Sequence, residues 1–334
     1  FALNACDSFV DVDTPASQLP SGTVFEDPGT ANAAMADVYA KLRDSGVITG
    51  STLGTSYTLG LYADELTYYG TGVNEEYTNN LIASSGTPAA AWSSGYTQIY
   101  GANAIIEGIA RSQSLDAALA GRLTGESLFI RALVHFYLVN LYGDIPYVTT
   151  TDYEVNRHIS RMPAEDVYQH IIDDLNEAIG LMSDDYPTAG RVRANKAVAQ
   201  ALLARVCQYR GDWAEAANMA SAVINNPQYV WEPDLQKVFL KESTSAIWQF
   251  QPRLDGNNTD EGGVFIFETG PPPAVALTDD LVNSFEPGDL RRQQWIRDIS
   301  DGVSTWHHAY KYRQNSDAGT SLEYSVVLRL AEQY

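Results

Sequence analysis

The stretch ALLARVCQYRGDWAEAANMASAVINNP, residues 201–227, decides the fold. Apolar residues recur at helical spacing on both sides of Gly211, which predicts one helix over 191–210 and a second over 212–224 that stops before Pro227. Small side chains let two helices approach closely, and both segments carry them: Ala201, Ala204, Ala216, Ala217, Ala220 and Ala222. The sequence therefore predicts a tightly packed helical hairpin.

This hairpin matches the unit of tetratricopeptide repeats, which is about 34 residues long. One such unit cannot bury its own apolar face, so neighbouring helices must cover it. The same spacing predicts more helices, over 30–43, 89–111, 115–142 and 163–187. We therefore predict a mainly α fold of tetratricopeptide-like helical hairpins, with repeats at about 30–48, 89–142, 163–227 and 322–334.

Two long segments lack a helical period and predict a loop-rich face with a few short strands, at about 50–86 and 228–321. The first is rich in Gly, Ser, Thr and Tyr, with a short helix expected at Leu59–Leu66. In the second, strands are expected at Ala246–Phe250 and Gly263–Phe267, and around the alternating aromatic residues that begin at Trp306. Loops this long are typically functional, so we expect the ligand here.

Composition excludes several classes of protein. The net charge of −21 on 334 residues repels the phosphates of nucleic acids, so we expect no nucleic-acid partner. Apolar residues make up 45% of the chain, which excludes a disordered protein. The two cysteines, Cys6 and Cys207, are too few and too far apart for a disulfide-stapled scaffold.

The first residues, FALNAC, resemble the end of a bacterial lipoprotein signal, in which Cys6 becomes the lipidated residue. Attached acyl chains hold such a protein on a membrane. We expect a lipobox and flexible tether over residues 1–20, followed by one domain over 21–334. A fortuitous match of these few residues is the alternative.

Several blocks together resemble the SusD/RagB family. They are GESLFIRALVHFYLVNLYGDIPYV (125–148), RMPAEDVYQHIIDDLNEAI (161–179), the hairpin block, VLRLAEQY at the end of the chain, DSFVDVDTP after Cys6, and LVNSFEPGDLRR around Phe285. The resemblance implies a surface lipoprotein of Bacteroidetes that binds glycans without catalysis, in the outer membrane, as a lid over a SusC-like TonB-dependent transporter. It also implies four tetratricopeptide-like units. Family members continue beyond the last block, so we expect the final unit to be incomplete here.

Binding of a neutral sugar needs flat aromatic side chains for its C–H faces and a few polar groups for its hydroxyls. The adjacent Tyr68 and Tyr69 lie in the first loop segment, just after Asp64. In the second, the candidate platforms are Trp295, Trp306 and Tyr310. Asn103, Asp64 and Arg291 are candidate hydroxyl partners.

Each candidate also has a structural interpretation. An aromatic strand face packed on helices gives the same pattern as a platform, and Asn103, Asp64 or Arg291 could be a cap or a solvated charge. We assign five other aromatic residues to packing, because they fall on helix faces, in the hairpin turn or in a strand: Trp92, Tyr96, Tyr100, Trp213 and Trp248. Trp231 fits either role.

The acidic charge favours a neutral glycan, such as a marine β-glucan, over an anionic one. No metal motif is present in the sequence, and we expect no cofactor; the loop 255–263 could hold calcium but lacks EF-hand spacing. Two alternatives remain open: a tetratricopeptide scaffold that binds a protein peptide, and a glycoside hydrolase, since two suitably spaced carboxylates suffice for hydrolysis.

Overall fold

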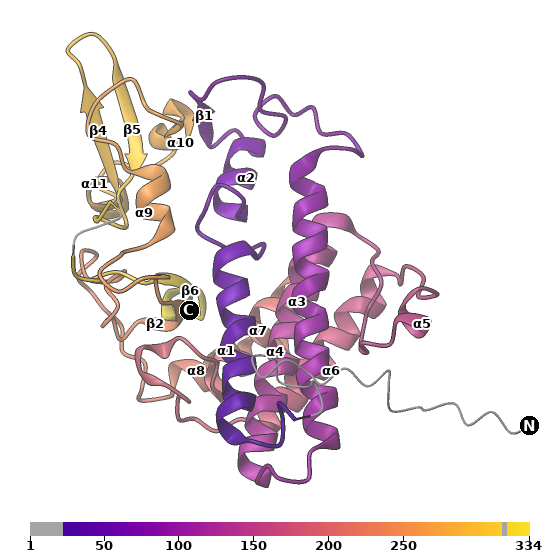
Figure 1. Cartoon of the computed structure of the whole chain (residues 1–334). Helices are drawn as coiled ribbons and strands as arrows, with labels where there is room; N and C mark the ends of the chain where they lie inside the picture. The colour runs from indigo at the N-terminus through magenta and orange to yellow at the C-terminus, as the bar shows by residue number, and fades with distance from the viewer. Residues whose placement is uncertain (1–22, 316–318) are drawn as a thin grey trace, which may run out of the picture.

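The computed structural model describes residues 23–315 and 319–334. Long helices form its body, which occupies the lower part of Figure 1. They are α1 (Pro28–Ser45), α3 (Gly86–Arg111), α4 (Ala117–Tyr142), α6 (Ala164–Leu181), α7 (Lys196–Arg210) and α8 (Trp213–Ile224). The predicted mainly α class is confirmed.

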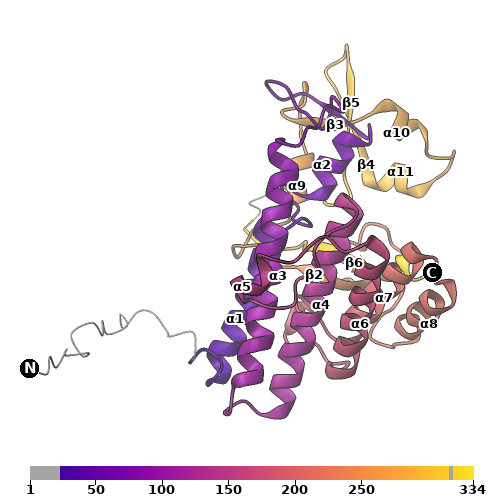
Figure 2. The same ribbon diagram turned by 90° about the vertical axis from the view of Figure 1, so that its right-hand side faces the viewer.

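Helix α4 is the centre of this body. Almost every side chain from Leu123 to Val139 is buried, as expected for a helix that is apolar on all sides. Helices α3 and α6 pack along it, and α7 and α8 continue the layer beyond α6 (Figure 2). The antiparallel pair predicted over 89–142 is thus present.

Helices α7 and α8 form the predicted hairpin, but α7 begins later in the sequence than predicted. Asn195 caps α7 by accepting a hydrogen bond from the backbone N–H of Val198 at 3.0 Å, so the helix begins at Lys196 rather than at residue 191. Ahead of it, Ala189–Arg191 forms a separate short 3₁₀ turn. Gly211 ends α7 with φ +87°, a left-handed conformation that glycine adopts without steric cost.

Paired charges lie inside the helical body. Arg131 of α4 donates to both carboxylate oxygens of Asp174 on α6, at 2.7 and 2.6 Å. Arg193 donates in the same bidentate way to Glu126, whose side chain is fully buried. Burial raises the pKa of Glu126, and the Arg193 guanidinium opposes that effect.

Shorter elements form a loop-rich end, at the upper left of Figure 1. Its four-stranded antiparallel sheet has the strand order β1–β3–β5–β4. The elements of this end are α2 (Thr55–Tyr62), β1 (Leu66–Tyr68), α9 (Asp260–Phe265), β3 (Val275–Leu277), α10 (Asp279–Asn283), α11 (Leu290–Trp295), β4 (Ile296–Ser300) and β5 (Thr305–Ala309).

A second, two-stranded sheet of β2 (Ala246–Phe250) and β6 (Ser325–Arg329) lies between this end and the helices. Trp248 of β2 is fully buried, and its ring lies 5.2 Å from that of Phe129 on α4 in an edge-on arrangement. The predicted strand and the packing role of Trp248 are confirmed.

Three local predictions were wrong. Gly263–Phe267 is not a strand: Thr259 caps the short helix α9 there, with two carboxylates in its first turn. The expected helix over 322–334 is instead β6 followed by a 3₁₀ turn (Leu330–Glu332), because its β-branched residues pair with β2. The short helix α2 ends at Tyr62 instead of Leu66, since Asp64 turns the chain with φ +59°.

Among the helices of the described residues, none is both long and apolar enough to cross a membrane. The expected lipidation site at Cys6 and the tether over 1–20 lie outside the described residues.

The short helix α5 (Tyr153–Asn156) lies to the right of the body in Figure 1.

Candidate functional site

The two loop segments meet in one sheet. Strand β1 of the first segment pairs with β3 of the second, with Leu66 opposite Leu277. Beyond the strand, the backbone N–H of Tyr69 donates to the carbonyl of Ala274 at 2.7 Å, and Thr278 donates to the backbone oxygen of Asp64 at 3.0 Å. Residues far apart in the sequence therefore share one end of the molecule.

Tyrosines of the first segment are exposed at this end. The exposed fractions are 47% for Tyr62, 38% for Tyr69 and 37% for Tyr77. Tyr68 is half-buried, with its ring 6.3 Å from that of Tyr77. Of these two adjacent residues, Tyr69 is therefore the more exposed, and Tyr68 has the inward position.

A pocket of about 370 Å³, here called the α2 pocket, is lined by one of these tyrosines, Tyr62. Its walls come from α2, the loop after β1 and the ends of α3 and α4. The lining residues are mostly apolar: Val47, Leu53, Thr55, Thr58, Leu59, Tyr62, Glu76, Leu81, Thr87, Pro88, Ala91, Asn140, Leu141 and Tyr142.

Glu76 is the one carboxylate among the described residues that line the α2 pocket. It is only 8% exposed, and no ion pair or side-chain hydrogen bond to it is found within the described part of the chain. Burial raises the pKa of the nearby Tyr57, and the charges of Tyr68 and Glu76 add to that rise. Apolar walls with one carboxylate and a few neutral polar groups suit a sugar, whereas glycoside hydrolysis needs a pair of carboxyl groups.

Trp306 lies on β5, two strands from β1 and so about 10 Å away. Its ring packs with Phe267, Ala276 and Ile299 and covers the backbone of Gly270, where a Cβ atom would overlap the ring. The side chain is half-buried. It therefore combines a packing role with a partly open ring.

Trp295 and Tyr310 have partners on their rings. The indole N–H of Trp295 donates to the carbonyl of Leu235 at 2.9 Å, and its ring lies edge-on to Phe239 at 5.2 Å. Two guanidinium groups, of Arg297 and Arg313, lie 5.4 and 5.1 Å from the centre of the Tyr310 ring. These contacts favour the packing interpretation over an open platform.

The polar candidates are dispersed. Asn103 is fully buried; its amide donates to the carbonyl of Val148 at 3.0 Å and accepts from Arg131 at 2.9 Å. We therefore leave it out of any surface site. Arg291 is exposed and forms a bidentate pair with Asp289, while Asp64 is an exposed turn residue.

Sequence reasoning missed several exposed rings. Tyr62 was expected inside a helix and Tyr77 was not singled out. Tyr100 and Trp213 were assigned to packing, yet they are 56% and 68% exposed. A usable signal exists for Trp213, since it directly follows the α7–α8 turn, where a side chain can point outward.

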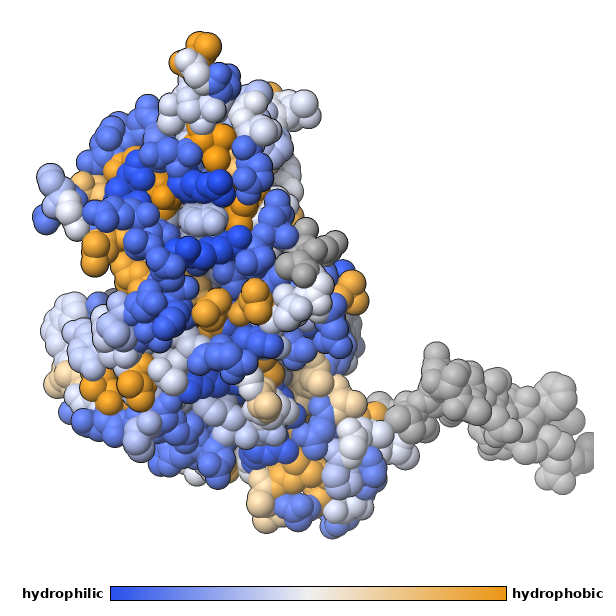
Figure 3. All heavy atoms as spheres, turned by 90° about the vertical axis from the view of Figure 1, so that its left-hand side faces the viewer, coloured by the Kyte–Doolittle hydropathy of each residue, from blue (hydrophilic) through white to orange (hydrophobic). Residues whose placement is uncertain are grey.

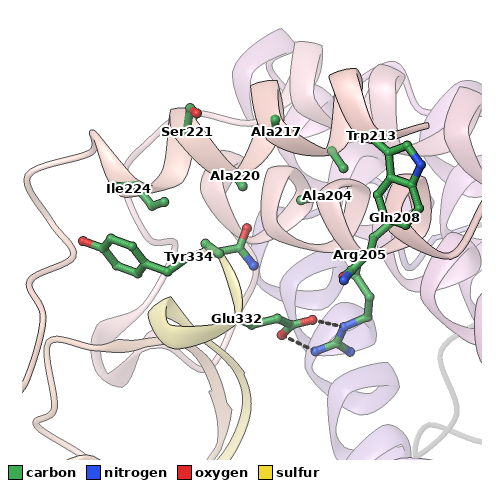
Figure 4. Close-up of a pocket in the computed structure, with 12 residues that line it drawn as sticks. Ala204, Arg205, Gln208, Trp213, Ala217, Ala220, Ser221, Ile224, Glu332 and Tyr334 are labelled. Carbon is green, nitrogen blue, oxygen red and sulfur yellow. Dashed lines mark hydrogen bonds and ion pairs between the residues drawn. The ribbon is translucent and has the colours of Figure 1, made fainter. Parts of the chain in front are cut away.

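Trp213 lies at one end of a second hollow, here called the α8 groove (Figure 4). It is about 440 Å³ and runs between α8, α7 and the last described residues. Arg205 forms a bidentate ion pair with Glu332 across its floor. Such a groove is the place where a tetratricopeptide scaffold would hold a peptide.

The side of the molecule that carries the sheet is mostly hydrophilic, with small, separate apolar patches (Figure 3). No group of three or more histidine, cysteine or acidic side chains placed to hold a metal ion is found among the described residues. In the loop suggested for calcium, the side-chain Oδ1 atom of Asn258 accepts hydrogen bonds from the backbone N–H groups of Leu322 and Glu323 at 2.9 and 3.1 Å. That side chain has a structural role.

Residues 11–207 match the family of SusD-like proteins described as starch-binding and associating with the outer membrane. SusD-like protein P2 of Formosa agariphila is 30% identical over 246 residues, which cover 70% of this chain and 47% of that protein. SusD-like protein P25 of the same organism is 23% identical over 321 residues, covering 87% of this chain and 59% of the relative. The chain thus spans about half the length of these curated relatives.

Solved structures share the fold. A SusD superfamily protein from Parabacteroides distasonis superposes with a TM-score of 0.77 at 23% identity, over 95% of this chain and 75% of that one. A laminarin-binding SusD-like protein gives 0.73 at 20% identity, over 92% and 78%. Since the family match covers more than half of its residues, the chain belongs to the SusD-like family, which is described as starch-binding and associating with the outer membrane.

Proposed function

We propose that this protein binds a neutral polysaccharide or oligosaccharide at its loop-rich end and does not cleave it. The observation that carries the proposal is the α2 pocket, with apolar walls, a buried acceptor in Glu76 and the exposed Tyr62 at its edge. Membership of a family described as starch-binding supports it.

The arginines of α11 and β4 at the loop-rich end already form ion pairs with acidic side chains, which supports a neutral ligand. Arg291, Arg292 and Arg297 form ion pairs with Asp289, Asp298 and Glu268, at 2.6, 2.9 and 3.5 Å. A carboxylate-bearing glycan would have to compete with those partners and with a net charge of −21. A β-glucan such as laminarin is our preferred ligand, and the name of the laminarin-binding structural neighbour makes it the first to test.

Affinity gels and amide NMR titrations with laminari-, cello- and malto-oligosaccharides test the proposal. Replacing Tyr62, which lines the pocket, or the exposed Tyr77, which follows the lining residue Glu76, by Ala should weaken binding roughly 2- to 10-fold each, because one stacking ring is lost. Tyr209→Ala is the matched control, since Tyr209 is 61% exposed on α7, away from the pocket. Binding that is unchanged in both loop variants would refute this site.

The two alternative functions, a glycoside hydrolase and a peptide-binding scaffold, predict different results. A hydrolase would release new reducing ends from a polysaccharide that the gel retains. A peptide-binding scaffold would lose its ligand on Trp213→Ala in the α8 groove and keep it when Tyr62 and Tyr77 are replaced.

The proposal extends to the cell surface. We propose that Cys6 carries a lipid that holds the protein on the outer membrane, and that a SusC-like TonB-dependent transporter receives the glycan. Expression of the protein with its native signal should give a membrane-bound form, and Cys6→Ser should release it into the soluble fraction. Co-purification with such a transporter from detergent extracts tests the partner.

A further inference from the structure

A second pocket on α3 has the chemistry of a sugar site. It is about 300 Å³, at the lower end of the usual range for small-molecule sites, and we call it the α5 pocket. Its lining residues are Trp92, Tyr96, Tyr100, Pro146, Val148, Thr150, Asn156 and Ile159. None of them carries a charge, so nothing in this lining would balance a charged ligand.

Three rings form one wall. Trp92, Tyr96 and Tyr100 are spaced by four residues and therefore follow one face of α3. Trp92 and Tyr96 lie 4.8 Å apart, and the Tyr96 hydroxyl is held by a 2.8 Å hydrogen bond to the carbonyl of Pro146. Tyr100 is 56% exposed, so its ring is the one open to a ligand.

The pocket also contains an unused acceptor. The Asn156 side-chain nitrogen donates to the carbonyl of Thr150 at 2.8 Å, which fixes the amide orientation because a carbonyl can only accept. The Asn156 Oδ1 atom is buried and has no hydrogen-bond partner among the described residues. An unpaired buried acceptor is costly, and a hydroxyl donor would satisfy it.

The wall opposite α3 is held in place. Thr150 and Thr151 donate to the Glu107 carboxylate at 2.8 and 2.6 Å, and the Thr151 backbone N–H adds a third bond at 2.8 Å. These bonds lower the pKa of Glu107 and keep it ionised against the effect of burial. A pocket fixed by such bonds loses little conformational freedom on binding.

The α5 pocket adjoins the α2 pocket without being part of it. Trp92 of the former lies edge-on to Tyr142 of the latter, with 5.1 Å between ring centres, so these two rings stand between the pockets. Helix α5, at the right of Figure 1, contributes Asn156 to the lining of the α5 pocket.

We propose that the α5 pocket is a second saccharide site, which takes one neutral sugar unit with its C–H face on Tyr100. A small shift of the Asn156 side chain uncovers its buried Oδ1 atom, which then accepts a hydrogen bond from a sugar hydroxyl. The inference rests on its own geometry and does not require binding in the α2 pocket. It gives the chain two places to hold a polymer, which raises the affinity for long glycans over short ones.

Amide NMR can report the two pockets separately. Wild-type protein is titrated with tri- and hexasaccharides of the laminari, cello and malto series. We expect shifts for the backbone amides of 146–159 and for the Asn156 side-chain amide. Tyr100→Ala should weaken binding at these signals roughly 2- to 10-fold, Tyr100→Phe should retain it, and Asn156→Leu should weaken it.

Tyr209→Ala, an exposed tyrosine outside both pockets, should behave like wild type. The inference is overturned if these amides do not shift with any oligosaccharide, or if Tyr100→Ala leaves their titration unchanged. Shifts confined to the α2 pocket would overturn it while leaving the proposed function intact. Shifts confined to the α5 pocket would support the inference and refute the proposed site.

Discussion

In the helical body, charged side chains are buried and paired, whereas at the loop-rich end aromatic side chains are left partly exposed. Arg131 and Asp174 have side chains only 9% exposed, and each satisfies the other. At the other end, Tyr62, Tyr69 and Tyr77 keep more than a third of their surface open. The most deeply buried ion pairs of the described residues thus lie in the body, whereas open aromatic surface occurs at the loop-rich end and also on the body, at Tyr100 and Trp213.

This difference has a functional meaning. A buried ion pair is sensitive to the loss of either partner, so it fixes the relative positions of α4 and α6. An exposed ring contributes little to stability and stays available for a ligand. Trp306 and Trp295 show that the loop-rich end also uses rings for its own packing, so exposure, rather than residue type, separates the two roles.

The largest effect should come from breaking a pair in the body. Asp174→Ala leaves the Arg131 guanidinium buried without its carboxylate and removes the acceptor of a 2.5 Å hydrogen bond from Tyr147. We expect the free energy of unfolding to fall by about 3–5 kcal/mol, measured by urea denaturation. Lys41→Ala is the control, because its pair with Asp37 is more than half exposed and should contribute less than about 1 kcal/mol. Equal losses in the two variants would remove the distinction between the buried and exposed pairs.

A smaller effect should come from the packing within the loop-rich end. Gly270→Ala places a methyl group where the Trp306 ring lies, so the ring must move. We expect a loss of about 1–3 kcal/mol, together with a change in near-UV circular dichroism. Gly263→Ala is the control, since nothing lies within 4 Å of its Cβ position. Unchanged spectra in Gly270→Ala would contradict the described position of Trp306.

The helical body could be predicted from sequence because its signals are local. Helical spacing, Gly211 and the flanking prolines lie within a few residues of the elements that they define. The sheet could not be predicted this way, because its first pairing joins Leu66 to Leu277 and leaves no signal in either segment alone. The exposure of single rings was harder still to predict. Trp92 and Tyr100 share one stripe of α3, but Trp92 packs on Tyr142 of α4, whereas Tyr100 is 56% exposed.

The polar candidates show the same limit. Asn103 has a residue type suited to sugar hydroxyls, yet Arg131 and the carbonyl of Val148 occupy its amide. Both partners come from outside α3, so the spacing within that helix gives no indication of them.

The body should also respond to acid. His135 is fully buried; its Nδ1 lies 2.8 Å from the carbonyl of Arg131, and its Nε2 accepts from the N–H of Val148 at 3.2 Å, so the neutral ring uses both nitrogens. Burial lowers the pKa of His135 to about 3 from its ordinary 6.5. Below about pH 6.5 the His135 ring is therefore protonated in the unfolded chain but stays neutral in the folded chain. As a result, the free energy of unfolding decreases as the pH falls.

Between pH 7.5 and pH 5.5, the shifted pKa of His135 alone should lower the free energy of unfolding by about 1.4 kcal/mol. Burial also lowers the pKa of His308, which adds a loss of the same sign. Urea denaturation at the two pH values measures these losses together with the opposite contribution of carboxyls such as Glu126, whose pKa burial raises. The ring-proton resonance of His135 tests its own share directly and should not move between the two pH values. Movement of that resonance would show that the ring titrates in the folded protein.

The smallest effect should separate Tyr68, the last residue of β1, from Tyr69, which follows the strand. Tyr69 is 38% exposed, so Tyr69→Ala should leave the melting temperature nearly unchanged and weaken glycan binding roughly 2- to 10-fold if its ring is a platform. Tyr68 packs on the small cluster of Tyr57, Leu61, Leu66 and Val275, so Tyr68→Ala should lower the melting temperature more than Tyr69→Ala does. Calorimetric melting and oligosaccharide titration of both variants measure the contrast. If Tyr69→Ala destabilises the protein as much as Tyr68→Ala does, the exposed ring contributes to packing after all, and exposure does not separate binding rings from packing rings at this position.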